Sequence, residues 1–225
     1  MQFTYYGHAC FALETMGKKL LFDPFITGNP LAKHIDIDAI AADYILVSHG
    51  HGDHVADLVN IAKRTGAMVI GVYEIVGWVQ QQGVEKTHPM NFGPYNFEFG
   101  KLRFTPAAHS SALPDGSNGG NPGGFLIDND EGNFYYSGDT SLCMDLQLIP
   151  HYAKLNVAAL PIGGNFTMDV DDAVMAAQMI QCKKIIGVHY DTFPAIIIDK
   201  ETAREKFMAA GYELLLPAIG ETISL

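Results

Sequence analysis

Residues 49–54 read His-Gly-His-Gly-Asp-His, which places three imidazoles and one carboxylate in six consecutive positions. Imidazole nitrogen and carboxylate oxygen are the donors that borderline divalent ions such as Zn²⁺ accept in proteins. The two glycines let the backbone bend, so that alternate side chains can converge on one point. Incidental surface histidines are the competing interpretation, but three in one turn after a buried segment are hard to explain by packing, because each buried imidazole needs a polar partner. The hexapeptide therefore predicts a metal site.

The segments on either side of the hexapeptide indicate how it is positioned. Residues 43–48 form a short apolar run that we expect as a buried strand, and residues 55–64 have helical spacing. The hexapeptide would then occupy a strand-to-helix turn at the carboxyl end of a strand, where α/β folds place their chemistry.

Three further ligand-type residues, His109, Asp139 and His189, each follow an apolar segment expected to be a strand. Any one of them alone would more often be a satisfied core or turn residue. Four strand ends that all carry ligand-type residues form a pattern that packing does not predict. A centre with two metal ions would need about this many ligands.

The remaining pattern predicts an α/β fold. We expect strands at 3–6, 9–14, 19–22, 44–47, 68–72, 157–160, 185–188 and 212–216, hairpins joining 96–99 to 102–107 through Gly100-Lys101 and 124–127 to 133–136, and helices at 55–64, 74–82, 170–180 and 200–210. Strands and helices interleave in both halves, which favours two sheets packed face to face with helices outside. No linker or fixed-period repeat interrupts the chain, so residues 1–225 are predicted to form a single domain.

Composition narrows the classes of function. The chain has 48% apolar residues, a net charge of −11 and only 14 Lys plus Arg, which disfavours a nucleic-acid or anionic membrane partner. The glycine-rich segment 110–124 carries no Lys or Arg. Cys10, Cys143 and Cys182 form no C-x-x-C pair, and no secretory signal or long apolar span is visible, so we expect reduced thiols and a cytoplasmic protein.

The ligand pattern resembles the metallo-β-lactamase superfamily over nearly the whole chain. The matching elements, in order, are His49-x-His51-x-Asp53-His54, His109, Gly138-Asp139-Thr140 and His189. The resemblance implies a four-layer αββα sandwich of two mixed sheets and a centre with two divalent ions. Within the superfamily, the chain resembles a family of small metal-dependent hydrolases. That family is related to ascorbate-phosphate lactonases and to the N-acyl-phosphatidylethanolamine phospholipase D type. The segments that carry the narrower likeness are 6–9, 22–25, 120–125, 161–168 and 189–194.

The resemblance also implies the ligand roles. One ion would be held by His49, His51 and His109, the other by Asp53, His54 and His189, and Asp139 would bridge the two. His51 stands where the iron flavoprotein branch of the superfamily has Glu, which disfavours diiron oxygen chemistry. Zn²⁺ is the favoured ion, although a nitrogen and oxygen ligand set also suits Mn²⁺ or Fe²⁺.

Five residues near the expected ligands are candidates for supporting roles. His8, in a Gly-His turn, is either a catalytic substrate contact or a satisfied turn histidine. Asp23 is expected to orient a ligand histidine or its loop. Asn165 precedes an expected helix start that could hold an anionic group or simply be capped. Tyr190 and Thr192 flank His189 and could contact substrate.

The expected function is hydrolysis of a small ester, lactone or phosphodiester by a metal-bound hydroxide, with Asp53 orienting the water or accepting its proton. No Ser-His-Asp or Cys-His nucleophile pattern competes with it. The alternatives are an RNA-processing phosphodiesterase of the same fold and a non-catalytic metal-binding or sensing protein. We expect a small-molecule substrate and no nucleic-acid or membrane partner, and the sequence leaves a homo-oligomer open.

Overall fold

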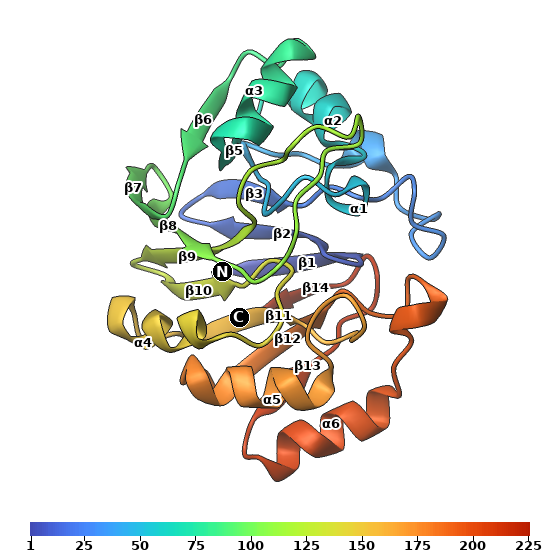
Figure 1. Ribbon diagram of the computed structural model, residues 1–225, viewed down its shortest axis with the longest axis vertical. Coiled ribbons are helices and arrows are strands. Elements are labelled where there is room, and N and C mark those ends of the chain that lie inside the picture. The colour runs from blue at the N-terminus through green and yellow to red at the C-terminus, as the bar shows by residue number, and fades with distance from the viewer.

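The computed structural model describes residues 1–225 and contains two seven-stranded sheets that face each other, with helices on both outer sides (Figure 1). The first sheet has the order β14-β1-β2-β3-β4-β5-β6, and the second has the order β13-β12-β11-β10-β9-β8-β7. The first comprises β1 (Gln2–Gly7), β2 (Cys10–Thr15), β3 (Lys18–Phe22), β4 (Tyr44–Leu46), β5 (Met68–Val72), β6 (Thr87–Met90) and β14 (Thr222–Ser224). The second comprises β7 (Gly93–Phe97), β8 (Gly100–Pro106), β9 (Gly123–Asn129), β10 (Gly132–Tyr136), β11 (Val157–Pro161), β12 (Lys184–Val188) and β13 (Glu213–Leu215).

The helices lie outside the two sheets and complete a four-layer αββα sandwich, as the sequence predicts. They are α1 (Gly52–Val55), α2 (Leu58–Thr65), α3 (Tyr73–Gln81), α4 (Ile149–Tyr152), α5 (Val170–Met179) and α6 (Lys200–Ala209), with short 3₁₀ turns η1 (Ile37–Ala39), η2 (Met144–Leu148) and η3 (Pro194–Ile196). Helices α2 and α3 cover the first sheet, and α4, α5 and α6 lie on the side of the second (Figure 1). None of the helices combines the length and apolarity that crossing a bilayer requires.

Strand direction brings several carboxyl ends to one side of each sheet. In the first sheet β1 and β3 are both antiparallel to β2, and β4 is parallel to β3. In the second sheet β8 and β10 are both antiparallel to β9, and β11 and β12 run parallel to β10. Two backbone hydrogen bonds join the sheets at these ends: Gly123 N–H donates to the carbonyl of Ser48 at 3.0 Å, and His189 N–H donates to that of His8 at 2.8 Å. The loops after these strands therefore meet.

Aromatic side chains fill the space between the sheets. Phe11 and Phe22 of the first sheet stack with ring centroids 4.5 Å apart. Phe134 and Tyr136 of the second sheet pack on them, with centroid distances of 6.1 Å from Phe22 to Phe134 and 5.1 Å from Phe11 to Tyr136. All four side chains are fully buried. Each contributes about 1.5–3 kcal/mol by leaving water, so this layer stabilises the face-to-face packing.

Four details of the predicted elements are corrected. The chain does not close on the strand expected at 212–216, because β13 is followed by β14, which pairs with β1 at Phe3↔Ile223. Such a short strand paired with a segment more than 200 residues away gives no local signal. Strand β6 and the helical stretch η2–α4 were not anticipated. The hairpin between β7 and β8 turns at Glu98-Phe99 rather than Gly100-Lys101, since Phe97 pairs with Gly100.

The helix expected at 55–64 is also wrong, because it is two helices, α1 and α2, separated at Asp57. The buried Asp57 carboxylate accepts hydrogen bonds from the backbone N–H groups of Ile26 at 2.6 Å and Thr27 at 2.9 Å. A buried carboxylate needs such donors. Asp57 thus ties the loop after β3 to the turn between the two helices.

Substitutions at two glycines, one tightly packed and one with open space around it, test the packing of strand β9. A β-carbon on Gly124 of β9 would lie 2.4 Å from the carbonyl oxygen of Tyr136, whereas one on Gly77 of α3 would meet nothing within 4 Å. Gly124→Ala should lower the free energy of unfolding by about 1–3 kcal/mol, because β9 and β10 must separate. Gly77→Ala should raise it by about 0.5–1 kcal/mol through helix propensity. Urea unfolding of the metal-free chain measures both, and destabilisation of similar size in the two variants would contradict the strand packing.

Candidate metal centre

Three histidines from two loops form the first cluster of possible ligands. His49 and His51 come from the turn after β4, and His109 from the loop after β8. Their nearest ring nitrogens all lie within 4.8 Å of one another, and Nε2 of His49 lies 2.9 Å from Nδ1 of His51. Donors bound tetrahedrally to Zn²⁺ at 2.0–2.1 Å lie roughly 3.3 Å apart. The convergence of these nitrogens therefore suits one ion.

A second cluster lies beside the first. It contains Asp53 and His54 from α1, His189 from the end of β12 and His8 from the end of β1, and one ligand atom from each lies within 4.8 Å of the others. The structure thus brings together in two adjacent clusters six of the seven residues predicted as metal ligands. The seventh is Asp139.

Asp139, in the loop after β10, lies between the two clusters. Its Oδ2 atom is 3.0 Å from Nε2 of His189 and 3.3 Å from Nε2 of His54. The same oxygen is 3.7 Å from Nε2 of His109 and 4.0 Å from Nε2 of His49. One carboxylate oxygen therefore faces two imidazoles of each cluster.

Some buried polar atoms of this region have no hydrogen-bond partner within the chain. Nε2 of His54 and Oδ1 of Asp139 are among them. Native proteins leave very few buried polar atoms unpaired, and each such atom calls for a ligand, an ion or a water. An imidazole nitrogen and a carboxylate oxygen that face one space fit a divalent cation, so the donor set present suits the ion that the sequence predicts.

Asp23, directly after β3, holds the surroundings of the site in place. Its completely buried carboxylate accepts hydrogen bonds from the Ser48 N–H at 2.7 Å, the Ser48 hydroxyl at 2.6 Å and the Tyr136 hydroxyl at 2.7 Å. It also accepts from Nδ1 of His54 at 2.9 Å. This last bond fixes the His54 ring so that Nε2 points toward Asp139. A carboxylate behind a ligand imidazole orients it and increases its basicity.

The His8 side chain hydrogen-bonds to Asp53 of the candidate centre, and its ring lies 4.1 Å, centroid to centroid, from that of His189. Its Nε2 lies 3.1 Å from Oδ2 of Asp53 and its Nδ1 lies 3.0 Å from the Thr192 hydroxyl, and the side chain is fully buried. A carboxylate can only accept, so Nε2 carries the proton, and Nδ1 of the neutral ring then accepts from Thr192. His8 does not line the cavity described below, so the geometry gives no support to direct substrate contact and instead favours orientation of Asp53.

The backbone at the site is unusual. His8, Asp23 and His189 have positive φ angles of 56°, 41° and 55°. Residues other than glycine adopt this left-handed region rarely, and such conformations concentrate at functional sites where the surroundings hold them. The hydrogen bond from His189 N–H to the carbonyl of His8 holds two of the three.

Burial and neighbouring charges have opposing effects on the pKa values of several site residues. Burial, aided by the neighbouring His54, lowers the pKa of His49 well below its ordinary value of 6.5. Burial also opposes protonation of His54, but the carboxylates of Asp139 and Asp23 outweigh it and raise its pKa well above 6.5. Burial works against ionisation of Asp139, yet His189 and His54 lower its pKa well below 3.8. The negative charge of Asp139 and Asp23 thus favours a positive charge at this place. A divalent ion would supply more positive charge than one proton on His54.

A cavity of about 620 Å³ opens beside the two clusters. Its wall comprises His51, Asp53, His109, Ser110, Asp139, Phe166, His189, Phe193, Pro194 and Ala195. Ser110 begins the glycine-rich segment 110–124, which follows the predicted ligand His109. No individual role was predicted for the apolar members: Phe166, Phe193 and Pro194 lie in the family-like segments 161–168 and 189–194, and Ala195 lies just beyond them. The three other candidates, Asn165, Tyr190 and Thr192, are absent from the wall: Asn165 is exposed, Thr192 holds His8, and Tyr190 is buried against Tyr5.

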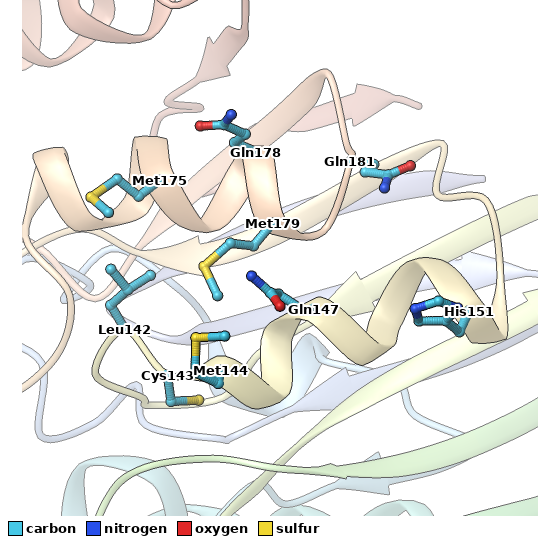
Figure 2. A pocket seen from close by; sticks show the side chains of 9 residues that line it. All are labelled: Leu142, Cys143, Met144, Gln147, His151, Met175, Gln178, Met179 and Gln181. Carbon is cyan, nitrogen blue, oxygen red and sulfur yellow. The ribbon is translucent and has the colours of Figure 1, made fainter.

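A second hollow, of about 700 Å³, lies between η2–α4 and α5 (Figure 2). Methionine side chains from both sides border it, among them Met144, Met175 and Met179, with Cys143 and His151 on the η2–α4 side (Figure 2). None of the clusters of possible metal ligands includes a residue of this hollow. The chemistry predicted from the sequence therefore belongs to the first cavity.

Known proteins are similar to this chain in fold and in sequence. Residues 2–189 match the family model of the beta-lactamase superfamily domain. The chain is 51% identical over 226 residues to a UPF0173 metal-dependent hydrolase of Flavobacterium johnsoniae, with 100% of both chains covered. The solved structure of Igni18, a metallo hydrolase from Ignicoccus hospitalis, superposes with a TM-score of 0.90 at 33% identity over 99% of this chain and 97% of that one. An isothiocyanate hydrolase from Delia radicum gut bacteria has a TM-score of 0.83 at 20% identity, covers 100% and 99% of the two chains, and shows the fold alone.

The two-sheet fold and the histidine and aspartate clusters, together with these relatives, define a metal-dependent hydrolase of the metallo-β-lactamase superfamily. Within that superfamily, the chain belongs to the UPF0173 family of metal-dependent hydrolases.

The hydrogen bond from His54 to Asp23 generates a test of metal affinity. Asp23→Asn keeps the size of the side chain but removes the charge behind the imidazole, so metal affinity should fall about 10–100-fold. Competition with a chromophoric chelator measures the change. Asp128→Asn, at an exposed aspartate, is the matched control and should bind metal as the unaltered chain does. Equal affinities in the two variants would contradict the orienting role of Asp23.

A second test concerns acid stability of the metal-free chain. Burial lowers the pKa of His8 to about 4 from 6.5 despite its contact with Asp53, and burial also lowers the pKa values of His49, His51 and His109. Between pH 6.5 and 4 the unfolded chain therefore binds more protons at these groups than the folded one. Their contribution to stability is fully present above pH 6.5 and is lost as the pH falls toward 4.

His8→Gln should flatten this dependence, whereas His151→Gln, at an exposed histidine, should not. Urea midpoints of the metal-free proteins at pH 7, 6 and 5 measure the effect. An unaltered slope in His8→Gln would show that His8 does not titrate as its burial requires.

Proposed function

We propose that this metal-dependent hydrolase uses two divalent ions, Zn²⁺ ahead of Mn²⁺ or Fe²⁺, to hydrolyse a small ester, lactone or phosphodiester. The residues that would hold the ions are His49, His51 and His109 in one set, Asp53, His54 and His189 in the other, and Asp139 between them. The observation that carries the proposal is the position of Oδ2 of Asp139 within 4.0 Å of Nε2 atoms from both sets. A carboxylate that would hold both ions has to lie between the two sets of ligands, as Asp139 does.

When bound, the ions would supply Lewis acidity for the attacked group and would lower the pKa of the attacking water. Asp53 is the cavity residue best suited to orient that water. Its carboxylate is 28% exposed, and His8 donates a hydrogen bond to its Oδ2. Burial works against ionisation, but the His8 hydrogen bond and the nearby His54 together lower the pKa of Asp53. A carboxylate with a depressed pKa is a weak base, so Asp53 would orient the water by accepting a hydrogen bond and would not retain its proton.

Charge supports a small-molecule substrate over a nucleic acid. The chain carries a net charge of −11, and no Lys or Arg lines the cavity. A polyanion is repelled by such a surface unless a local basic face intervenes. The three cysteines are free thiols, which supports our proposal of a cytoplasmic setting.

Metal content and activity should fall together when the shared ligand is removed. The unaltered chain, saturated with Zn²⁺ or Mn²⁺ and desalted, should retain close to two ions per chain by elemental analysis. Asp139→Ala should retain fewer than one, and its hydrolytic rate should fall at least about 100-fold, because the proposal makes Asp139 the contact common to both ions. Chelator treatment of the unaltered chain should abolish turnover, and added metal should restore it.

Asp128→Ala, at an exposed residue of β9 that belongs to none of the ligand clusters, is the control and should keep both ions and the full rate. A ratio that stays near one in the unaltered chain would remove the two-ion proposal but leave a one-ion hydrolase. A ratio near zero after incubation with both metals would remove the ligand assignment altogether.

A further inference from the structure

The cavity beside the metal centre has two chemically different sides. One side presents the imidazoles and carboxylates, and the other presents Phe166, Phe193, Pro194 and Ala195. The Phe166 side chain is 54% exposed although it is a large apolar group. Contiguous exposed apolar surface that borders a pocket commonly marks a binding site.

The two loops that supply the apolar side are held rigidly by their own backbones. In the loop after β11, Gly164 N–H donates to the carbonyl of Met168 at 2.9 Å, and Met168 N–H donates to that of Thr140 at 3.0 Å. In the loop after β12, Asp191 N–H donates to the carbonyl of Ile196 at 2.8 Å. Phe166 is therefore presented to solvent by a fixed loop rather than left there by a mobile one.

The loops also pack directly on each other. A β-carbon on Gly163 would lie 2.2 Å from the carbonyl oxygen of His189 and 2.9 Å from Cβ of Ile196. Only glycine permits this approach, which brings the segment carrying Phe166 against the segment carrying Phe193. The two phenylalanines thus line the same cavity from two loops that touch.

The cavity wall contains no lysine or arginine that could pair with an anionic group of a substrate. The lining contains the carboxylates of Asp53 and Asp139 but no Lys or Arg. The nearest lysines along the chain after the second loop are already paired, Lys200 with Asp191 at 2.9 Å and Lys206 with Asp171 at 2.7 Å. An anionic group of a ligand could contact the metal ions, but a second anionic group farther along the cavity would meet no compensating charge.

We propose that the substrate, beyond its scissile group, is uncharged and carries an apolar group about the size of a phenyl ring that packs against Phe166 and Phe193. The cavity therefore selects against phosphorylated or carboxylated substrates whose second anionic group lies away from the metals. This inference rests on the proposed hydrolytic function, because it places the scissile group at the metal centre.

Three methyl esters that differ only in the acyl group test the inference: methyl acetate, methyl phenylacetate and methyl (4-carboxyphenyl)acetate. In each case water adds to the acyl carbon and methanol leaves, and the released acid is followed by proton release. With the zinc-loaded chain, kcat/KM for methyl phenylacetate should exceed that for methyl acetate about 10–100-fold, as expected for burying a ring. The carboxylated ester should fall at least about 10-fold below methyl phenylacetate.

Substitutions on the wall should change these ratios in opposite ways. Phe166→Ala should reduce the preference for phenylacetate over acetate at least about 5-fold, because one of the two aromatic rings of the wall is lost. Ala195→Lys places a cation on the wall and should raise the relative kcat/KM of the carboxylated ester about 10-fold. Tyr73→Ala removes an aromatic side chain that is 73% exposed and absent from the cavity lining, and it should leave all ratios unchanged.

A binding measurement separates this inference from the proposed function. Phenylacetamide and its 4-carboxy derivative are amides that serve as probes, and saturation-transfer NMR detects either one on the zinc-loaded chain. If no methyl ester is turned over, the ester branch of the proposed function fails, while binding of phenylacetamide that weakens in Phe166→Ala still supports the uncharged apolar substrate. Equal or stronger binding or turnover of the carboxylated compound by the unaltered chain would overturn the inference. So would a phenyl preference that Phe166→Ala leaves intact.

Discussion

The hydrogen bonds of the buried Asp23 carboxylate hold the parts of the candidate centre together. A charge that is completely removed from water must be matched by donors, and here they come from both sheets. Ser48 belongs to the turn after β4, His54 to α1 and Tyr136 to the end of β10. Because these donors converge on one group, the turn that carries the hexapeptide, the short helix after it and the facing sheet have a fixed relation. The orientation of the His54 ring follows from the same requirement.

The residues of the candidate centre would destabilise the fold if they were buried without partners. Burial penalises every charged form, yet Asp139 and Asp53 are held ionised by the surrounding imidazoles. Left-handed backbone at His8, Asp23 and His189 adds strain. The aromatic layer between the sheets and the hydrogen bonds that join them at the site edge oppose these costs. Any ion that binds the folded chain and not the unfolded one adds to its stability, so metal binding and folding are coupled.

Reactive and apolar groups divide the cavity between them. The reactive side depends on residues at the ends of β4, β8, β10 and β12, which strand direction brings to one place. The apolar side depends on two loops that approach within contact only because Gly163 lacks a side chain. The family and the hydrolase class follow from the reactive side together with the relatives. The proposed selection among substrates depends on the apolar side.

The types and order of the candidate ligands and the arrangement of sheets and helices could be predicted from the sequence. His49 to His54, His109, Asp139 and His189 are conspicuous because each is a metal-type donor after an apolar strand, and side-chain chemistry and local periodicity are written in neighbouring residues. The sheet topology confirmed the predicted αββα class, and the family model confirmed the predicted superfamily.

Four features could be found only in the folded chain. They are the pairing of β14 with β1, the interruption between α1 and α2, the contact of His8 with Asp53, and the apolar cavity lining at Phe166 and Phe193. Each of these depends on segments far apart in the chain that meet only after folding. A phenylalanine at a cavity mouth has the same local pattern as one in a core, so its role emerges only when the neighbouring loop is in place.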